Sequence, residues 1–134
     1  MLADLLKNGF AEGKDLNCSE QILYGANQAY DLGLDKNALK LAAGFGGGMA
    51  IEDKCGALTG SIMVLSNMFI KERAHENDKI KELVSKLFSR YREVMGSIDC
   101  RPLKDDHRTE AYGCREVILK AAEILDQIIK EESN

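Results

Sequence analysis

Apolar residues recur every three or four positions along most of the chain, which places them on one face of successive helices. Glycines and capping residues separate these periodic stretches. The clearest stretch follows Asn77 or Asp78 and keeps its period until Gly96. The pattern predicts a short helix from Leu2 to Phe10, and further helices that begin at Cys18, at Asp35, at Lys54 or Cys55, at Asn77 or Asp78, and near Thr109.

Capping residues locate two of these helix starts. Asn17-Cys18-Ser19-Glu20 has the form of a capping box, so Cys18 is expected to be the first residue of its helix. Asp53 is expected to cap the helix that begins at Lys54 and Cys55. The segment from Ser97 to Arg108 shows no clear period and is expected to be irregular.

The fold class follows from this pattern together with composition. The chain has 134 residues, of which 45% are hydrophobic and 30% charged, and it contains one proline and no tryptophan. Leu, Ala, Lys and Glu are abundant, and these residues favour helix. We therefore expect an all-α fold, a compact bundle of about five or six helices, formed by residues 1–134 as a single helical four-cysteine domain.

The distribution of charged and apolar residues along the chain bears on which classes of partner the protein can bind. The formal net charge of -4 comes from 22 acidic and 18 basic side chains that are mixed along the chain. Without a basic stripe, nucleic acid is not expected as a partner. The apolar runs are too short to span a bilayer, so no direct membrane insertion is expected either. The N-terminus lacks the features of a signal peptide, which predicts a cytoplasmic location.

The four cysteines are the side chains of this sequence with the widest range of possible chemistry. Cys18 and Cys55 fall at predicted helix N-termini, Cys114 falls near another, and Cys100 lies in the segment expected to be irregular. A helix N-terminus stabilises the thiolate, the form that attacks disulfides and binds metals. Cys18 and Cys55 are accordingly the expected activated thiolates. The alternative is that each cysteine is a small buried apolar residue.

The cysteine spacing leaves several kinds of site open. The residues are widely separated and form no CxxC pair, so folding would have to assemble a site. Four thiolates suit a zinc ion or an iron–sulfur cluster, and they also suit two disulfide-forming pairs. Sequence does not rank the three pairings that four cysteines allow.

Glycines accompany the cysteines. Gly56 and Gly60 lie one helical turn apart, which favours either tight packing against another helix or room around a sulfur or cofactor. Gly47 and Gly48 belong to a glycine run without the form of a phosphate loop. That run either brings backbone N–H groups close to the sulfurs or is a flexible connection. His107 could act as a base or ligand, although a solvated histidine is the commoner case.

These residues together resemble a known family of redox-active proteins. The resemblance is carried by Asn17-Cys18, Gly46-Gly47-Gly48-Met49, Cys55-Gly-Ala-Leu-Thr-Gly60, Cys100 and Cys114. The order of the four cysteines and the CGAxxG segment are similar to the pattern that gives the C_GCAxxG_C_C family its name. The resemblance implies a helical domain with redox-active cysteines, iron–sulfur ligation in related domains that occur beside haem, and an association with transporter genes. Haem is not expected here, because the CxxCH attachment motif is absent.

Three readings of the function remain open at this stage. The first is thiol–disulfide chemistry or electron transfer at Cys18, Cys55, Cys100 and Cys114, which would make the chain a thiol-dependent oxidoreductase. The second is an iron–sulfur or zinc-binding module that uses the same four cysteines as ligands. The third is a non-catalytic helical interaction module associated with a transporter. The redox partner is not identified by the sequence, and a homo-oligomer is left open.

Overall fold

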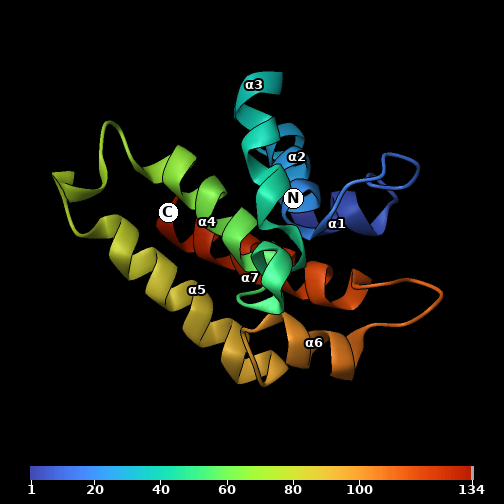
Figure 1. Cartoon of the computed structure of the whole chain (residues 1–134). Helices are drawn as coiled ribbons and strands as arrows, with labels where there is room; N and C mark the ends of the chain where they lie inside the picture. The colour runs from blue at the N-terminus through green and yellow to red at the C-terminus, as the bar shows by residue number, and fades with distance from the viewer. Residues whose placement is uncertain (134) are drawn as a thin grey trace.

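The computed structural model describes residues 1–133 and has an all-α fold (Figure 1). The helical elements in chain order are α1 (Leu2–Lys7), α2 (Cys18–Ala29), α3 (Lys36–Leu39), η1 (Lys40–Phe45), η2 (Gly48–Glu52), α4 (Gly56–Phe69), η3 (Ala74–Glu76), α5 (Lys79–Met95), α6 (Cys100–His107) and α7 (Arg115–Glu132). The all-α prediction is confirmed. The described residues contain seven α-helices, slightly more than the expected five or six.

One helix was missed by the sequence analysis. Residues 97–108 were expected to be irregular, but α6 occupies Cys100–His107. Pro102 lies in its first turn, where the missing N–H would have no partner within the helix. The proline therefore signals a helix start here, and the short polar helix has too few apolar positions to show a clear period.

The structure contains one of the two N-caps that the sequence predicts. The Asn17 side chain accepts a hydrogen bond from the Glu20 N–H, and the Glu20 carboxylate accepts one from the Asn17 N–H. This capping box confirms Cys18 as the first residue of α2. The expected Asp53 cap of α4 is wrong, because Cys55 itself occupies the N-cap and the Asp53 carboxylate pairs with Lys54.

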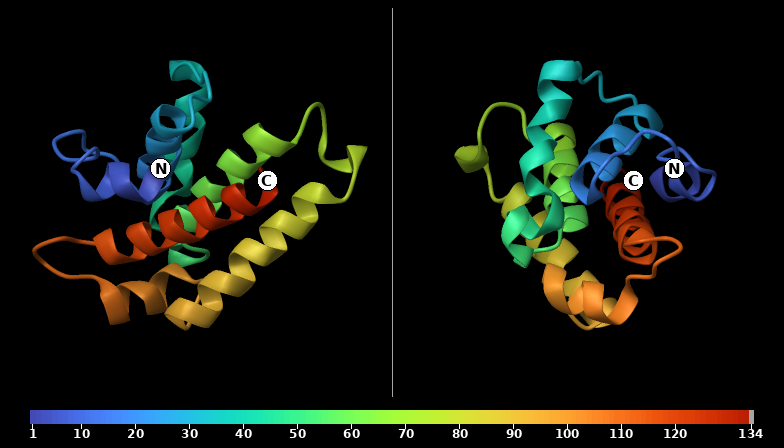
Figure 2. Two further views of the ribbon diagram at one scale, coloured as in Figure 1. Left: turned by 180° about the vertical axis from the view of Figure 1, so that it is seen from behind. Right: turned by 45° about the vertical axis from the view of Figure 1, so that its right-hand side comes forward.

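The core lies where the apolar faces of α2, α4, α5 and α7 meet. Leu58 and Val64 of α4 and Leu87 of α5 are fully buried, as are Leu125 and Ile128 of α7. Figures 1 and 2 show α5 and α7 lying side by side, with α4 packed against both and α6 at the C-terminal end of α5. Burying these side chains removes apolar surface from water, which is the main driving force for this packing.

Helix α1 is held against α7 by a carboxylate. Asp126 of α7 accepts hydrogen bonds from the backbone N–H groups of Leu2 and Ala3, at 3.1 and 2.9 Å. These N–H groups at the start of α1 have no partner within their own helix. The contact anchors α1, and Leu6 of α1 forms part of the groove described below.

A close approach of α2 and α4 fixes the position of the first cysteine. A Cβ atom at Gly60 would lie 2.8 Å from the Ser19 carbonyl oxygen, and one at Gly56 would lie 3.3 Å from Cys18 Cβ. The glycine face of α4 therefore packs directly on the first turn of α2. None of the helices in residues 1–133 is both long and apolar enough to cross a membrane.

Gly60→Ala should destabilise the fold because the added methyl group meets backbone atoms of α2. Overpacking typically costs about 1 to 3 kcal/mol, against a helix-propensity gain of about 1 kcal/mol, so the variant should lose stability overall. Gly44→Ala is the matched control, because no atom lies within 4 Å of its Cβ position. Urea unfolding measures both. Equal stability of the two variants would contradict the close α2–α4 contact.

Candidate functional site

Four helix starts meet at one place in the fold. Cys18 and Cys100 are the first residues of α2 and α6, and Cys55 and Cys114 are the N-caps of α4 and α7. All four side chains line one small cavity of about 10 Å³, together with Gly47 and Gly56. The four cysteines are free thiols. The structure thus brings together residues that are separated by up to 96 positions in the sequence (114 − 18).

A short backbone bridge positions Cys55 and Cys100. Lys54 and Asp99 form an isolated antiparallel bridge, in which the Cys55 N–H donates to the Ile98 carbonyl oxygen and the Cys100 N–H donates to the Asp53 carbonyl oxygen. The Lys54 ammonium also pairs with the Asp99 carboxylate at 2.6 Å. The starts of α4 and α6 are thereby fixed beside each other.

A strained turn borders the same cavity. Gly47, Gly48, Met49 and Ala50 all have φ between 62° and 64°, which is the left-handed region. This conformation costs an L-residue about 1 to 2 kcal/mol, so Met49 and Ala50 are strained. A Cβ atom at Gly48 would lie 2.7 Å from Cys100 Cβ. The turn therefore packs against Cys100 closely enough that only glycine fits at position 48.

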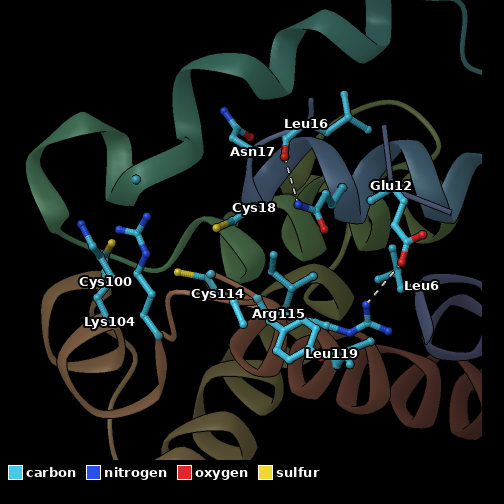
Figure 3. Close-up of a pocket in the computed structure, with 18 of the residues that line it drawn as sticks. Leu6, Glu12, Leu16, Asn17, Cys18, Cys100, Lys104, Cys114, Arg115 and Leu119 are labelled. Atoms are coloured by element: carbon cyan, nitrogen blue, oxygen red, sulfur yellow. Dashed lines mark hydrogen bonds and ion pairs between the residues drawn. The ribbon is translucent and has the colours of Figure 1, made fainter. Parts of the chain in front are cut away.

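Cys18 and Cys114 lie beside each other in the cluster. Figure 3 shows their sulfurs pointing into the same part of the site, one from α2 and the other from the start of α7, and each thiol shifts the pKa of the other. Both side chains are partly exposed, whereas Cys55 and Cys100 are buried, at 3% and 8% exposure. The cluster therefore contains a more exposed pair, Cys18 and Cys114, and a buried pair, Cys55 and Cys100.

Cys114 is the acidic thiol of this pair. The hydrogen bond from Cys18 lowers the pKa of Cys114 to about 6, and the positive charges of Arg108 and Lys104 act in the same direction. The pKa of Cys18 is raised, first by its hydrogen bond to Cys114 and then by burial. The two thiols thus shift each other's pKa in opposite directions, with the thiolate favoured at Cys114.

This arrangement corrects the expectation that Cys18 and Cys55 are the activated thiolates. Burial raises the pKa of Cys55 to about 11, although the N–H groups of Ala57 and Leu58 favour its thiolate. Burial also raises the pKa of Cys100, against the nearby charge of Lys104. A helix N-terminus alone does not produce a thiolate, because removal of the sulfur from water opposes it.

The predicted glycines occupy different parts of the site. Gly47 and Gly56 line the cysteine cavity, and Gly48 packs against Cys100. Gly60 lies one turn further along α4 and packs on Ser19 and Ile22 of α2. Both readings of the Gly56 and Gly60 pair therefore apply, with close helix packing at both positions and proximity to a cysteine at Gly56.

His107 lies at the opposite end of α6 from Cys100. It is the last residue of α6, and its Nδ1 atom lies 3.3 Å from a carboxylate oxygen of Glu116. It lines neither the cysteine cavity nor the groove beside it. The structure thus gives His107 an ion-pair partner and no contact with the thiols.

Three residues near the sulfurs were not singled out by the sequence. Tyr91 is fully buried, donates a hydrogen bond to the Val117 carbonyl oxygen at 3.0 Å, and also contacts the Cys55 sulfur. The periodic apolar pattern of α5 predicted only that Tyr91 would be part of the core. Lys104 lies in α6 and Arg108 is the C-cap of that helix, so their placement becomes informative only once α6 is known to be a helix.

The chemistry of the donor set suits zinc or an iron–sulfur cluster, since four thiolates ligate either. The geometry is less favourable. Among residues 1–133, no three His, Cys, Asp or Glu side chains lie close enough together to hold a metal ion. The residues therefore do not fit a metal centre in the arrangement that the structure describes.

Comparison with known families agrees with the cysteine geometry. The family model described as "Putative redox-active protein (C_GCAxxG_C_C)" matches residues 16–128, which include all four cysteines and most of the 134-residue chain. The chain belongs to this family. In this C_GCAxxG_C_C member the central segment reads Cys55-Gly-Ala-Leu-Thr-Gly60, with the cysteine before the first glycine. In comparisons with curated proteins and with solved structures, nothing matches the chain.

Cys114 should react with iodoacetamide at a lower pH than the other cysteines. Because its pKa lies near 6, its thiolate fraction should rise between about pH 5 and pH 7 and then level off. Cys18→Ala removes the donated hydrogen bond and should move the midpoint toward the ordinary thiol value of about 8.5. Mass spectrometry of alkylated peptides gives the profile for each residue. A Cys114 midpoint at or above about 8.5 in the unaltered protein would contradict this assignment.

Proposed function

We propose that the protein carries out thiol–disulfide exchange, with Cys114 as the attacking thiolate and Cys18 as the resolving thiol. The observation that carries the proposal is the pair of partly exposed thiols, Cys18 and Cys114, which approach each other from α2 and α7 and line the same groove (Figure 3). An exposed thiolate with a second thiol beside it has the two groups that exchange requires. Membership in a redox-active family supports the same chemistry.

The reaction proceeds in two displacements. The Cys114 thiolate attacks one sulfur of a substrate disulfide, the substrate S–S bond breaks, and the leaving thiolate takes up a proton. Cys18 then loses its proton to solvent, and its thiolate attacks the Cys114 sulfur of the mixed disulfide. This step forms the Cys18–Cys114 disulfide and releases the second substrate thiol. The substrate gains two electrons from the protein dithiol, and an external thiol reductant returns the protein to its starting state.

The charges around the pair support this order of attack. Lys104 and Arg108 stabilise the Cys114 thiolate, whereas burial and the hydrogen bond keep Cys18 protonated until the mixed disulfide has formed. Once Cys114 is in a disulfide it carries no negative charge, and the repulsion that disfavours a Cys18 thiolate disappears. The pair thus separates the roles of attack and resolution through electrostatics.

Two single variants test these roles. Cys18→Ser should still form a mixed disulfide with the substrate at Cys114 but should accumulate it, because no thiol remains in position to resolve it. Cys114→Ser should form no mixed disulfide at this pair and should lose dithiol turnover. Intact-protein mass spectrometry during reaction with a small disulfide distinguishes the two. The proposal fails if Cys114→Ser reacts as fast as the unaltered protein.

An iron–sulfur or zinc-binding module is the second candidate, and one observation favours it. All four sulfurs line a single cavity, and they are presented by four helix starts that favour anionic ligands. Since no three of these side chains within residues 1–133 are placed to hold a metal ion, binding would require the cysteines to rearrange. Anaerobic reconstitution with ferrous iron and sulfide tests this. Visible absorption that depends on all four cysteines would favour this function over disulfide exchange.

A further inference from the structure

A groove leads from the surface to the accessible cysteine pair (Figure 3). It encloses about 650 Å³, within the range of about 300 to 1,000 Å³ that is typical of small-molecule sites. Leu16, Ile118 and Leu119 contribute apolar surface to its lining, and Cys18 and Cys114 lie along it. Cys100 also contributes to the lining, although its side chain is only 8% exposed, and Cys55 does not, so Cys18 and Cys114 are the more exposed thiols in the groove.

The charge of this groove is opposite to that of the whole chain. Its lining contains three basic residues, Lys104, Arg108 and Arg115, and one acidic residue, Glu12, whereas the chain has a net charge of -4. A concave, positively charged surface in an acidic protein concentrates anions and speeds their association. The charge of the lining therefore favours negatively charged molecules.

Arg108 supplies the uncompensated charge. Lys104 pairs with Glu52 at 2.9 Å. Arg115 lies 3.8 Å from Glu12, an ion pair that Figure 3 marks with a dashed line. Within residues 1–133, no carboxylate is paired with the exposed Arg108 guanidinium. Its charge nevertheless acts on the sulfurs of both Cys114 and Cys100. Arg108 thus lines the same groove as Cys114 and, within residues 1–133, forms no ion pair that would compete with an anionic ligand.

We infer that the groove binds a low-molecular-mass disulfide whose flanking groups carry carboxylates, and that Arg108 recognises the carboxylate. An arginine binds a carboxylate through paired, charge-assisted hydrogen bonds. The apolar lining would contact the carbon atoms between the carboxylate and the disulfide. The inference rests on the proposed exchange at Cys114 and adds the class of its substrate. The bonds that form and break are those of the exchange itself, so two substrate thiols are released as the Cys18–Cys114 disulfide forms.

The test compares three disulfides of different charge in their first reaction with Cys114. Oxidised glutathione is anionic, bis(2-hydroxyethyl) disulfide is neutral and cystamine is cationic. The unaltered protein is compared with Arg108→Gln, with the charge-preserving Arg108→Lys, and with Arg73→Gln as a matched control. Arg73 is exposed in the connection between α4 and α5, away from the groove. Rapid quench and mass spectrometry give the rate of mixed-disulfide formation.

The quantity that decides the inference is the ratio of the glutathione rate to the rate for the neutral disulfide. This ratio cancels any change in Cys114 reactivity, because the same thiolate attacks both compounds. It should fall about tenfold in Arg108→Gln, be largely retained in Arg108→Lys, and not change in Arg73→Gln. Added salt should also lower the ratio in the unaltered protein.

The outcomes separate this inference from the proposed function. If Cys114 reacts with all three disulfides and Arg108→Gln leaves the ratio unchanged, the substrate class is wrong and the exchange stands. A preference for cystamine would likewise overturn the substrate class. If none of the disulfides forms an adduct with Cys114, the proposed exchange is itself wrong.

Discussion

The close contact between α2 and α4 is the constraint on which the site depends. The Gly56 and Gly60 face lets α4 approach the first turn of α2 to within contact of backbone atoms, and this fixes Cys18 relative to Cys55. The bridge between Lys54 and Asp99 then ties the start of α4 to the start of α6, which brings Cys100 into the same cluster. Helix α7 completes it with Cys114. Each contact places a helix start, and each helix start presents one thiol.

Burial and neighbouring charges then give the four thiols different pKa values, although each thiol lies at a helix start. All four sulfurs lie at a helix N-terminus, which stabilises negative charge, yet only the pKa of Cys114 is lowered. Desolvation outweighs the helix effect at Cys55 and Cys100, and Cys18 donates its proton toward Cys114. The chemistry thus follows from the balance between solvent access and neighbouring charges.

Local signals in the sequence predicted much of this arrangement. The capping box at Asn17 located α2, and the periodic apolar residues of α5 and α7 predicted their helices. The shared cysteine cluster was suggested by the family resemblance and the helix starts. The choice of Cys114 over Cys18 and Cys55 was not predictable, because it depends on burial and on Arg108 and Lys104. Those two residues reach the sulfur only through α6, which the short polar segment around Pro102 did not reveal.

The central claim is that Cys18 and Cys114 are the reactive pair of the cluster. The most direct measurement is disulfide mapping of the anaerobically purified protein after addition of one equivalent of an oxidant that removes two electrons. Peptide mass spectrometry with differential alkylation then identifies the first bond that forms. The account predicts a Cys18–Cys114 disulfide, with Cys55 and Cys100 still reduced. A first disulfide between Cys55 and Cys100, or between one residue of each pair, would contradict it.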